Sequence, residues 1–150
     1  MHYFENKTIV VPFDFSEPKT AAIDKAIAMS DESTTIYAIH VVVPIPILIS
    51  VDPGMPILPS NDENRKQIAF KNMQEVFGKG KYSRLKLECR IGDAGSEIVD
   101  FANSVESDMI IMPSHGRTGL SRILIGSVAE RVLRLSSCPV LVLREPNQTE

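Results

Sequence analysis

Short runs of apolar residues alternate with helical patterns along the chain, and this alternation limits the fold more than any other feature. Apolar, mostly β-branched runs predict strands at residues 7–12, 34–43, 85–91, 108–112 and 140–143. Apolar residues at helical spacing predict helices that follow residue 16, span 61–77, follow residue 96 and span 127–135. Strands that alternate with helices indicate an α/β fold, in which a mostly parallel sheet carries helices on both faces.

Two serines at turns are candidate helix N-caps. Ser16 precedes the first predicted helix, whose first turn tolerates Pro18, and Ser96 ends the turn before the third. The apolar residues that mark the first three helices are Ala22, Ile23, Ala26, Ile27, Ile68, Phe70, Met73, Phe77, Ile98, Val99, Ala102 and Val105.

Length and composition predict one ordinary globular domain that spans residues 1–150 and has a single hydrophobic core. An apolar content of 43% with 23% charged residues argues against disorder. The net charge of −3 argues against broad nucleic-acid binding, which needs a concentrated basic face. Half of the ten prolines fall within residues 44–60, which predicts a long loop, and residues 145–150 are predicted to form a polar tail.

The chain has the features of a cytoplasmic protein. Its two cysteines, Cys89 and Cys138, have no zinc-ligand spacing and are expected to be reduced, partly buried thiols. No signal peptide is apparent at the N-terminus. The longest apolar stretch, residues 37–51, is interrupted by Pro44 and Pro46 and is too short to span a bilayer, so no membrane association is expected.

Residues suited to ligand binding follow two of the predicted strands. Open parallel sheets bind ligands outside the carboxyl ends of their strands, where the winding reverses. Residues 12–14 follow the first strand and residues 113–127 follow the fourth. If these two strands are neighbours, both segments face the same crevice.

The second of these segments suits a phosphate group. Gly116 and Gly119 allow the backbone to turn and approach a ligand, and Gly126-Ser127 opens a helix whose N-terminal N–H groups favour an anion. An equally simple interpretation is that Ser127 caps the helix and the glycines serve only the turn. Neither the GxxxxGK[ST] phosphate loop nor the GxGxxG dinucleotide pattern occurs in the chain.

Nearly the whole chain resembles the nucleotide-binding universal stress proteins. The family pattern is Gly, two residues, Gly, nine residues, then Gly-Ser or Gly-Thr, and Gly116 and Gly126-Ser127 match its last three positions. The other matching segments are Val-Pro-Phe-Asp-Phe-Ser at 11–16, Ile-His-Val at 39–41 and Cys-Pro-Val-Leu-Val-Leu at 138–143. The resemblance implies an open, twisted five-stranded parallel sheet of order 3-2-1-4-5, as in the adenine nucleotide alpha hydrolase-like fold.

The resemblance also implies a bound adenine nucleotide, with ATP as the cofactor and Mg²⁺ as a candidate companion ion. It implies a homodimer paired through the edge strand Val140–Leu143. The residues implied to flank the adenine and ribose are Pro12, Asp14 and Val41. Those implied to surround the phosphates are Gly116, Gly126, Ser127 and Val128, with Met112 lining the pocket.

Pro113 departs from the family pattern, because it stands where the pattern has its first glycine. Proline has no N–H to donate, and its ring fills space that glycine leaves open. One lost hydrogen bond, worth about 0.5–1.5 kcal/mol, weakens binding several-fold without abolishing it.

Other polar residues have plainer interpretations. Asp14 is a candidate acceptor for the nucleotide or a ligand of Mg²⁺ through water, or else an acceptor for neighbouring loop N–H groups. His115 lacks an evident partner for general-base catalysis and is expected to shape its loop or to lie beside the phosphates. His40 is expected to be a strand residue, not a metal ligand. Four arginines near the glycine-containing segment fall into two pairs: Arg117 and Arg122 are expected to reach phosphates or solvent, and Arg131 and Arg134 are expected to be exposed.

Three functions are compatible with these features. The leading hypothesis is an ATP-binding stress-response switch with at most slow ATP hydrolysis. An alternative is a nucleotide-free dimeric interaction protein whose crevice is altered by Pro113. A nucleotide-hydrolysing or adenylate-forming enzyme is disfavoured, because no glycine-rich pyrophosphate loop follows the first strand.

Overall fold

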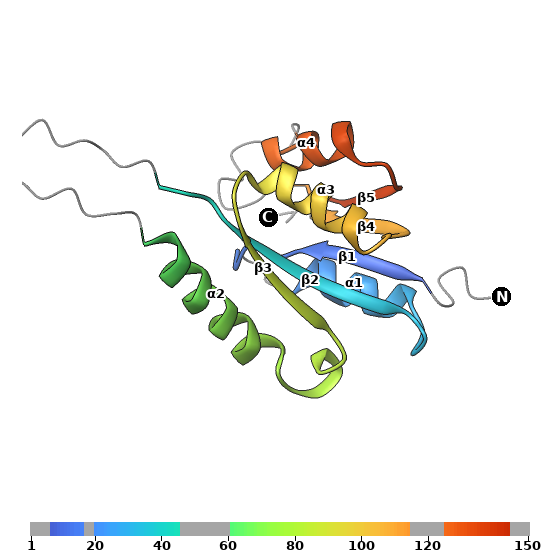
Figure 1. The fold of residues 1–150 in the computed structure, drawn as a ribbon. Helices are drawn as coiled ribbons and strands as arrows, with labels where there is room; N and C mark the ends of the chain where they lie inside the picture. The colour runs from blue at the N-terminus through green and yellow to red at the C-terminus, as the bar shows by residue number, and fades with distance from the viewer. Residues whose placement is uncertain (1–6, 17–19, 46–60, 115–124, 145–150) are drawn as a thin grey trace, which may run out of the picture.

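The computed structural model describes residues 7–16, 20–45, 61–114 and 125–144. Within these ranges, five strands alternate with four helices and one short 3₁₀ turn (Figure 1). In chain order these are β1 (Thr8–Pro12), α1 (Ala21–Met29), β2 (Thr35–Val42), α2 (Asp62–Phe77), η1 (Gly80–Tyr82), β3 (Lys86–Ile91), α3 (Ala94–Ser104), β4 (Met109–Pro113), α4 (Ser127–Leu135) and β5 (Val140–Leu143).

The strands form one parallel sheet of order β3-β2-β1-β4-β5, as predicted. At its centre the backbone of β1 is flanked on both faces by apolar side chains, and Ile9, Val10 and Val11 have no solvent exposure. Such burial explains the run of β-branched residues, because a strand covered on both faces has no polar side.

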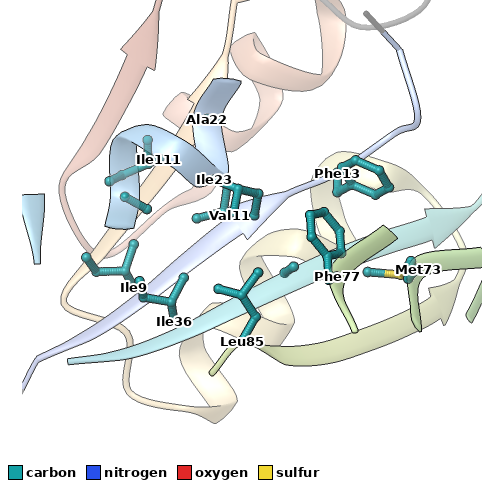
Figure 2. Packing of buried hydrophobic residues seen from close by; sticks show 12 residues of the cluster. Ile9, Val11, Phe13, Ala22, Ile23, Ile36, Met73, Phe77, Leu85 and Ile111 are labelled. Atoms are coloured by element: carbon teal, nitrogen blue, oxygen red, sulfur yellow. The ribbon is translucent and has the colours of Figure 1, made fainter. Parts of the chain in front are cut away.

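Helices cover both faces of the sheet. α1 and α2 pack on one face, where their buried side chains meet Ile9, Val11 and Ile36 (Figure 2). α3 and α4 pack on the other face against Val10, Ile39 and Ile110. This arrangement confirms the predicted α/β layering.

The predicted N-caps of α1 and α3 are wrong, and carboxylates explain both differences. The Asp14 carboxylate accepts hydrogen bonds from the N–H of Ser16, at 3.0 Å, and from its hydroxyl, so Ser16 belongs to a turn. α1 instead starts after Thr20. At α3 the Asp93 carboxylate accepts the N–H of Ser96 at 2.9 Å and is the N-cap. This hydrogen bond lowers the pKa of Asp93.

The side of α2 that faces the sheet differs partly from the apolar pattern of the sequence. Its buried residues, Ala69, Met73 and Phe77, follow one another at intervals of four. Ile68 lies beside this stripe and is 53% exposed. The apolar pattern does not mark Ala69, because alanine is only a weak hydrophobic signal. Its small side chain nevertheless packs closely in the core.

Cys89 is buried, Cys138 is half-buried and neither forms a disulfide. Burial raises the pKa of the Cys89 thiol, which therefore packs as a neutral group. No helix in the described ranges is long and apolar enough to cross a membrane.

Candidate functional site

A cavity of about 750 Å³ lies at the carboxyl ends of β1, β2 and β4. β1 and β4 are neighbours. This is the condition for the segments that follow these two strands to face the same crevice. The predicted site residues that the structure describes all line this cavity: Pro12, Asp14, Val41, Met112, Pro113, Gly126, Ser127 and Val128. His115 and Gly116, together with Arg117, Gly119 and Arg122, lie outside the described residues.

Two prolines explain why the sheet opens between β1 and β4. β1 pairs with β2 over five residues, but its register with β4 ends at Val10 opposite Ile110. Alternation along the strands directs the nitrogens of Pro12 and Pro113 toward each other's strand. Since neither has an N–H, the next two ladder bonds cannot form, and the strand ends part around the cavity.

The corner after β1 is fixed by several short contacts. The Phe13 N–H donates to the Ile39 carbonyl at 2.8 Å, which continues the pairing with β2 by one residue. Phe15 has a φ of 64°, a conformation that is costly for a residue with a bulky side chain. Its ring packs edge-on against Phe13, with centroids 4.6 Å apart, and against His40 at 4.9 Å. Strain held in place at a cavity wall is typical of binding sites.

The opposite wall is formed where β4 leads to α4. The Ser114 N–H donates to Leu143 on β5 at 2.9 Å, and the Ser114 carbonyl accepts the Gly126 N–H at 2.7 Å. These bonds bring Gly126 beside the end of β4. Gly126 is the N-cap of α4, and as a glycine it has no side chain with which to cap the helix. The interpretation of Ser127 as a cap is therefore wrong, because Ser127 is the first residue within the helix.

The start of α4 faces the cavity, where Gly126, Ser127, Val128 and Ala129 form part of the wall. The first N–H groups of a helix have no partners within it and carry the positive end of its dipole. This end of the cavity can therefore bind an anionic group through backbone donors.

α2 contributes a wall that the sequence patterns did not reveal. Arg65, Ile68, Ala69 and Asn72 line the cavity from this helix. The Arg65 guanidinium donates to the Val43 carbonyl at 3.0 Å and to the Asp62 carboxylate at 2.7 Å, which ties the start of α2 to the end of β2. The three-residue spacing of Asp62 and Arg65 on a helix could have predicted their ion pair. It could not have predicted the contact of Arg65 with the end of β2.

His40 is a buried strand residue whose Nδ1 lies 2.7 Å from the Phe13 carbonyl oxygen. The described part of the chain contains no cluster of three or more His, Cys, Asp or Glu residues placed to hold a metal ion. Asp14 lines the cavity and also accepts the loop hydrogen bonds from Ser16, so it is partly a structural acceptor.

Known proteins share this architecture over nearly its whole length. The model of the universal stress protein family matches residues 5–144. Universal stress protein MJ0531 of Methanocaldococcus jannaschii is 36% identical over 152 aligned positions, which cover 95% of this chain and 84% of that protein. MJ0577 of the same organism is 31% identical, over 94% of this chain and 96% of its own.

The solved structure of MJ0577 superimposes on this chain with a TM-score of 0.75 at 28% identity, covering 96% of this chain and 99% of that one. The sheet order and the matched residues 5–144 agree with these similarities. The chain therefore belongs to the universal stress protein family.

Proposed function

We propose that this chain binds an adenine nucleotide in the cavity at the carboxyl edge of its sheet and acts as a nucleotide-dependent switch in the stress response. The observation that carries the proposal is the pairing, within one cavity of about 750 Å³, of an apolar wall with a helix N-terminus whose N-cap residue is glycine. A cavity of this size falls within the range of ligand pockets, about 300–1,000 Å³.

The two ends of the cavity suit the two ends of a nucleotide. Val41, Val43, Ile68 and Ala69 supply an apolar wall for a base, and Val43 and Ile68 are more than half exposed there. A bound base would remove this apolar surface from water. The start of α4 lies on the other side and suits phosphates.

ATP is the first candidate ligand, with Mg²⁺ as its companion, because the family resemblance implies them. We expect hydrolysis to be slow at most. A base that activates water must be positioned and available, and the Asp14 carboxylate already accepts the N–H and the hydroxyl of Ser16. The role of His115 near the phosphates stays a prediction.

The absence of an N–H at Pro113 does not by itself argue against a nucleotide. In this sheet the proline helps to part β1 from β4 and so contributes to the opening of the cavity. Its loss of one donor is offset in part by the N–H groups of the first turn of α4, which have no partner within the helix.

We also propose a homodimer paired through β5. This strand is at the edge of the sheet, and its four residues are all apolar and half-buried. Leu133 and Leu135 on the neighbouring α4 are 43% and 47% exposed. An uncovered apolar edge favours pairing with a second copy, which would close the interface around a two-fold axis.

The nucleotide proposal is tested by calorimetric titration of nucleotide-stripped protein with Mg-ATP up to millimolar concentration. Gly126 has φ −61° and ψ 157°, which any residue adopts, so Gly126→Val should fill the cavity end without straining the backbone. Arg134→Val places the same side chain on an exposed position of α4 and is the matched control.

Saturable binding by the wild type and by Arg134→Val, lost in Gly126→Val, would support the proposal. No heat and no shift in melting temperature with wild-type protein at millimolar ATP would refute it. The nucleotide-free interaction protein would then be the better description.

A further inference from the structure

β2 extends beyond its neighbour β1 at the wall of the cavity. The last register pair of the two strands is Pro12 with Ile39, whereas β2 stays paired with β3 as far as Val42 opposite Ile91. Residues 40–42 of β2 therefore have a strand partner on one side only. Their other side faces the cavity, which Val41 lines.

Two hydrogen bonds establish which backbone groups point into this gap. The Ile39 carbonyl accepts from Phe13, on the β1 side, and the Val42 carbonyl accepts from Gly92, on the β3 side. Successive residues of a strand direct their N–H and C=O groups to opposite sides. The N–H and C=O of Val41 are therefore directed toward the β1 side, where β1 has ended.

A continued ladder would join the Val41 N–H to the Phe13 carbonyl. Among the described residues no backbone hydrogen bond joins Val41 to Phe13 or to Phe15. The imidazole of His40 takes that place, because its Nδ1 lies 2.7 Å from the Phe13 carbonyl oxygen. A carbonyl oxygen only accepts, so Nδ1 carries the hydrogen and donates it.

Packing holds the His40 ring in this position. The side chain is 9% exposed, and the Phe15 ring contacts it edge-on, with centroids 4.9 Å apart and an interplanar angle of 71°. Phe15 in turn packs against Phe13, and its φ of 64° places it in this stack. The imidazole therefore has little room to leave the Phe13 carbonyl.

We propose that His40 is a positioning residue for base recognition: by holding the Phe13 carbonyl, it keeps the N–H and C=O of Val41 directed into the cavity. An adjacent backbone donor and acceptor complement adenine, whose ring edge offers an acceptor at N1 and a donor at N6. They clash with guanine, which offers a donor at N1 and an acceptor at O6. The part of this inference that concerns the base rests on the proposed function, but the part that concerns the backbone does not.

The backbone part is tested without any ligand by amide hydrogen exchange of the wild type, read by NMR. We expect the Val41 amide to exchange about tenfold faster, or more, than the amides of His40 and Val42, which face β3. In His40→Leu the Phe13 carbonyl is released, and the Val41 amide should become as protected as its neighbours. An equally protected Val41 amide in the wild type, or an unchanged one in a folded His40→Leu, would overturn the inference.

The base-recognition part is tested by titrating ATP and GTP into the wild type, His40→Asn and His40→Leu. The side-chain nitrogen of asparagine lies as many bonds from Cα as Nδ1 of histidine and can donate to the Phe13 carbonyl, so His40→Asn should keep the wild-type preference for ATP. His40→Leu should bind ATP about tenfold more weakly with little change for GTP, the effect of about one hydrogen bond.

An equal loss of both nucleotides in His40→Leu, or an ATP preference that His40→Asn fails to restore, would show a purely structural role and overturn the inference. A wild type that binds no nucleotide would refute the proposed function, and the exchange experiment would still decide whether His40 frees Val41. If His40→Leu does not fold, the inference is tested by the exchange rate of the Val41 amide in the wild type and by the preference of His40→Asn for ATP over GTP.

Discussion

A negative charge at the start of α4 should raise stability and lower nucleotide affinity at the same time. Ser127 is exposed, is the first residue of the helix and lines the cavity. In Ser127→Asp a carboxylate meets the positive end of the helix dipole, next to the N-cap residue Gly126, which has no side chain. Such charges stabilise a helix by about 0.3–1 kcal/mol, so the free energy of unfolding should rise by that amount.

The same carboxylate would repel a phosphate bound at the start of α4. Two like charges about 4 Å apart repel by about 1 kcal/mol in water and about 4 kcal/mol near a protein surface. The dissociation constant of ATP should therefore rise at least about fivefold, and less at high salt, where the charges are screened. Ser127→Asn has nearly the same shape without the charge and is the matched control.

Urea unfolding measures the first effect, and calorimetric titration with ATP and with adenosine measures the second. Adenosine has no phosphate, so its affinity should be the same in Ser127→Asp and Ser127→Asn. If ATP binds both variants equally well, or if adenosine loses as much affinity as ATP, phosphates do not lie at the start of α4.

Three further predictions concern the core, a helix cap and the sheet edge. Met73 has no solvent exposure, so Met73→Ala should lower the free energy of unfolding by about 2–5 kcal/mol in urea melts, and Gln74→Ala on the exposed side should change it by less than about 0.5 kcal/mol. The pKa of Asp93 is lowered by the Ser96 N–H, so its stabilisation is complete above the unfolded value of 3.8 and is lost as the pH falls through the folded value. The difference in melting temperature between the wild type and Asp93→Ala should thus be largest near neutral pH and shrink toward pH 3; a difference independent of pH would contradict this. Val142→Lys in β5 should yield monomers in sedimentation equilibrium whereas Gln74→Lys stays dimeric, and a monomeric wild type would disprove the proposed pairing.

The strands could be predicted from the sequence because each buried strand carries its own signal. Ile9, Val10 and Val11 need no knowledge of their neighbours to be recognised as a strand covered on both faces. The order of the strands followed from the family resemblance and is confirmed. Helix starts were less predictable, since Asp93 and Ser96 both suit a cap and only the backbone geometry selects Asp93.

The walls of the site were predictable where they are strand ends, and not where they come from α2. Pro12, Asp14 and Met112 follow directly from the strands that carry them. Ile68 and Asn72 reach the cavity because α2 lies over the end of β2, a placement that no local pattern encodes. The hydrogen bond of His40 to Phe13 joins residues 27 positions apart and likewise has no local signal. The roles of His115 and Gly116 stay predictions.

The two prolines at the ends of β1 and β4 have a mechanical consequence. Backbone hydrogen bonds are directional and resist sliding, whereas apolar packing tolerates small shifts of one surface over another. Beyond Val10 and Ile110 the two strands have no paired residues, and side chains of α3 and α4 pack across this seam against Ile39, Ile110 and Met112. The cavity therefore lies over the boundary between β1 and β4 where, among the described residues, the strand register has ended, and a ligand that touches Val41 and Gly126 spans this boundary. We therefore expect a ligand in this cavity to contact both the β3-β2-β1 part of the sheet and the part that ends in the β5 edge.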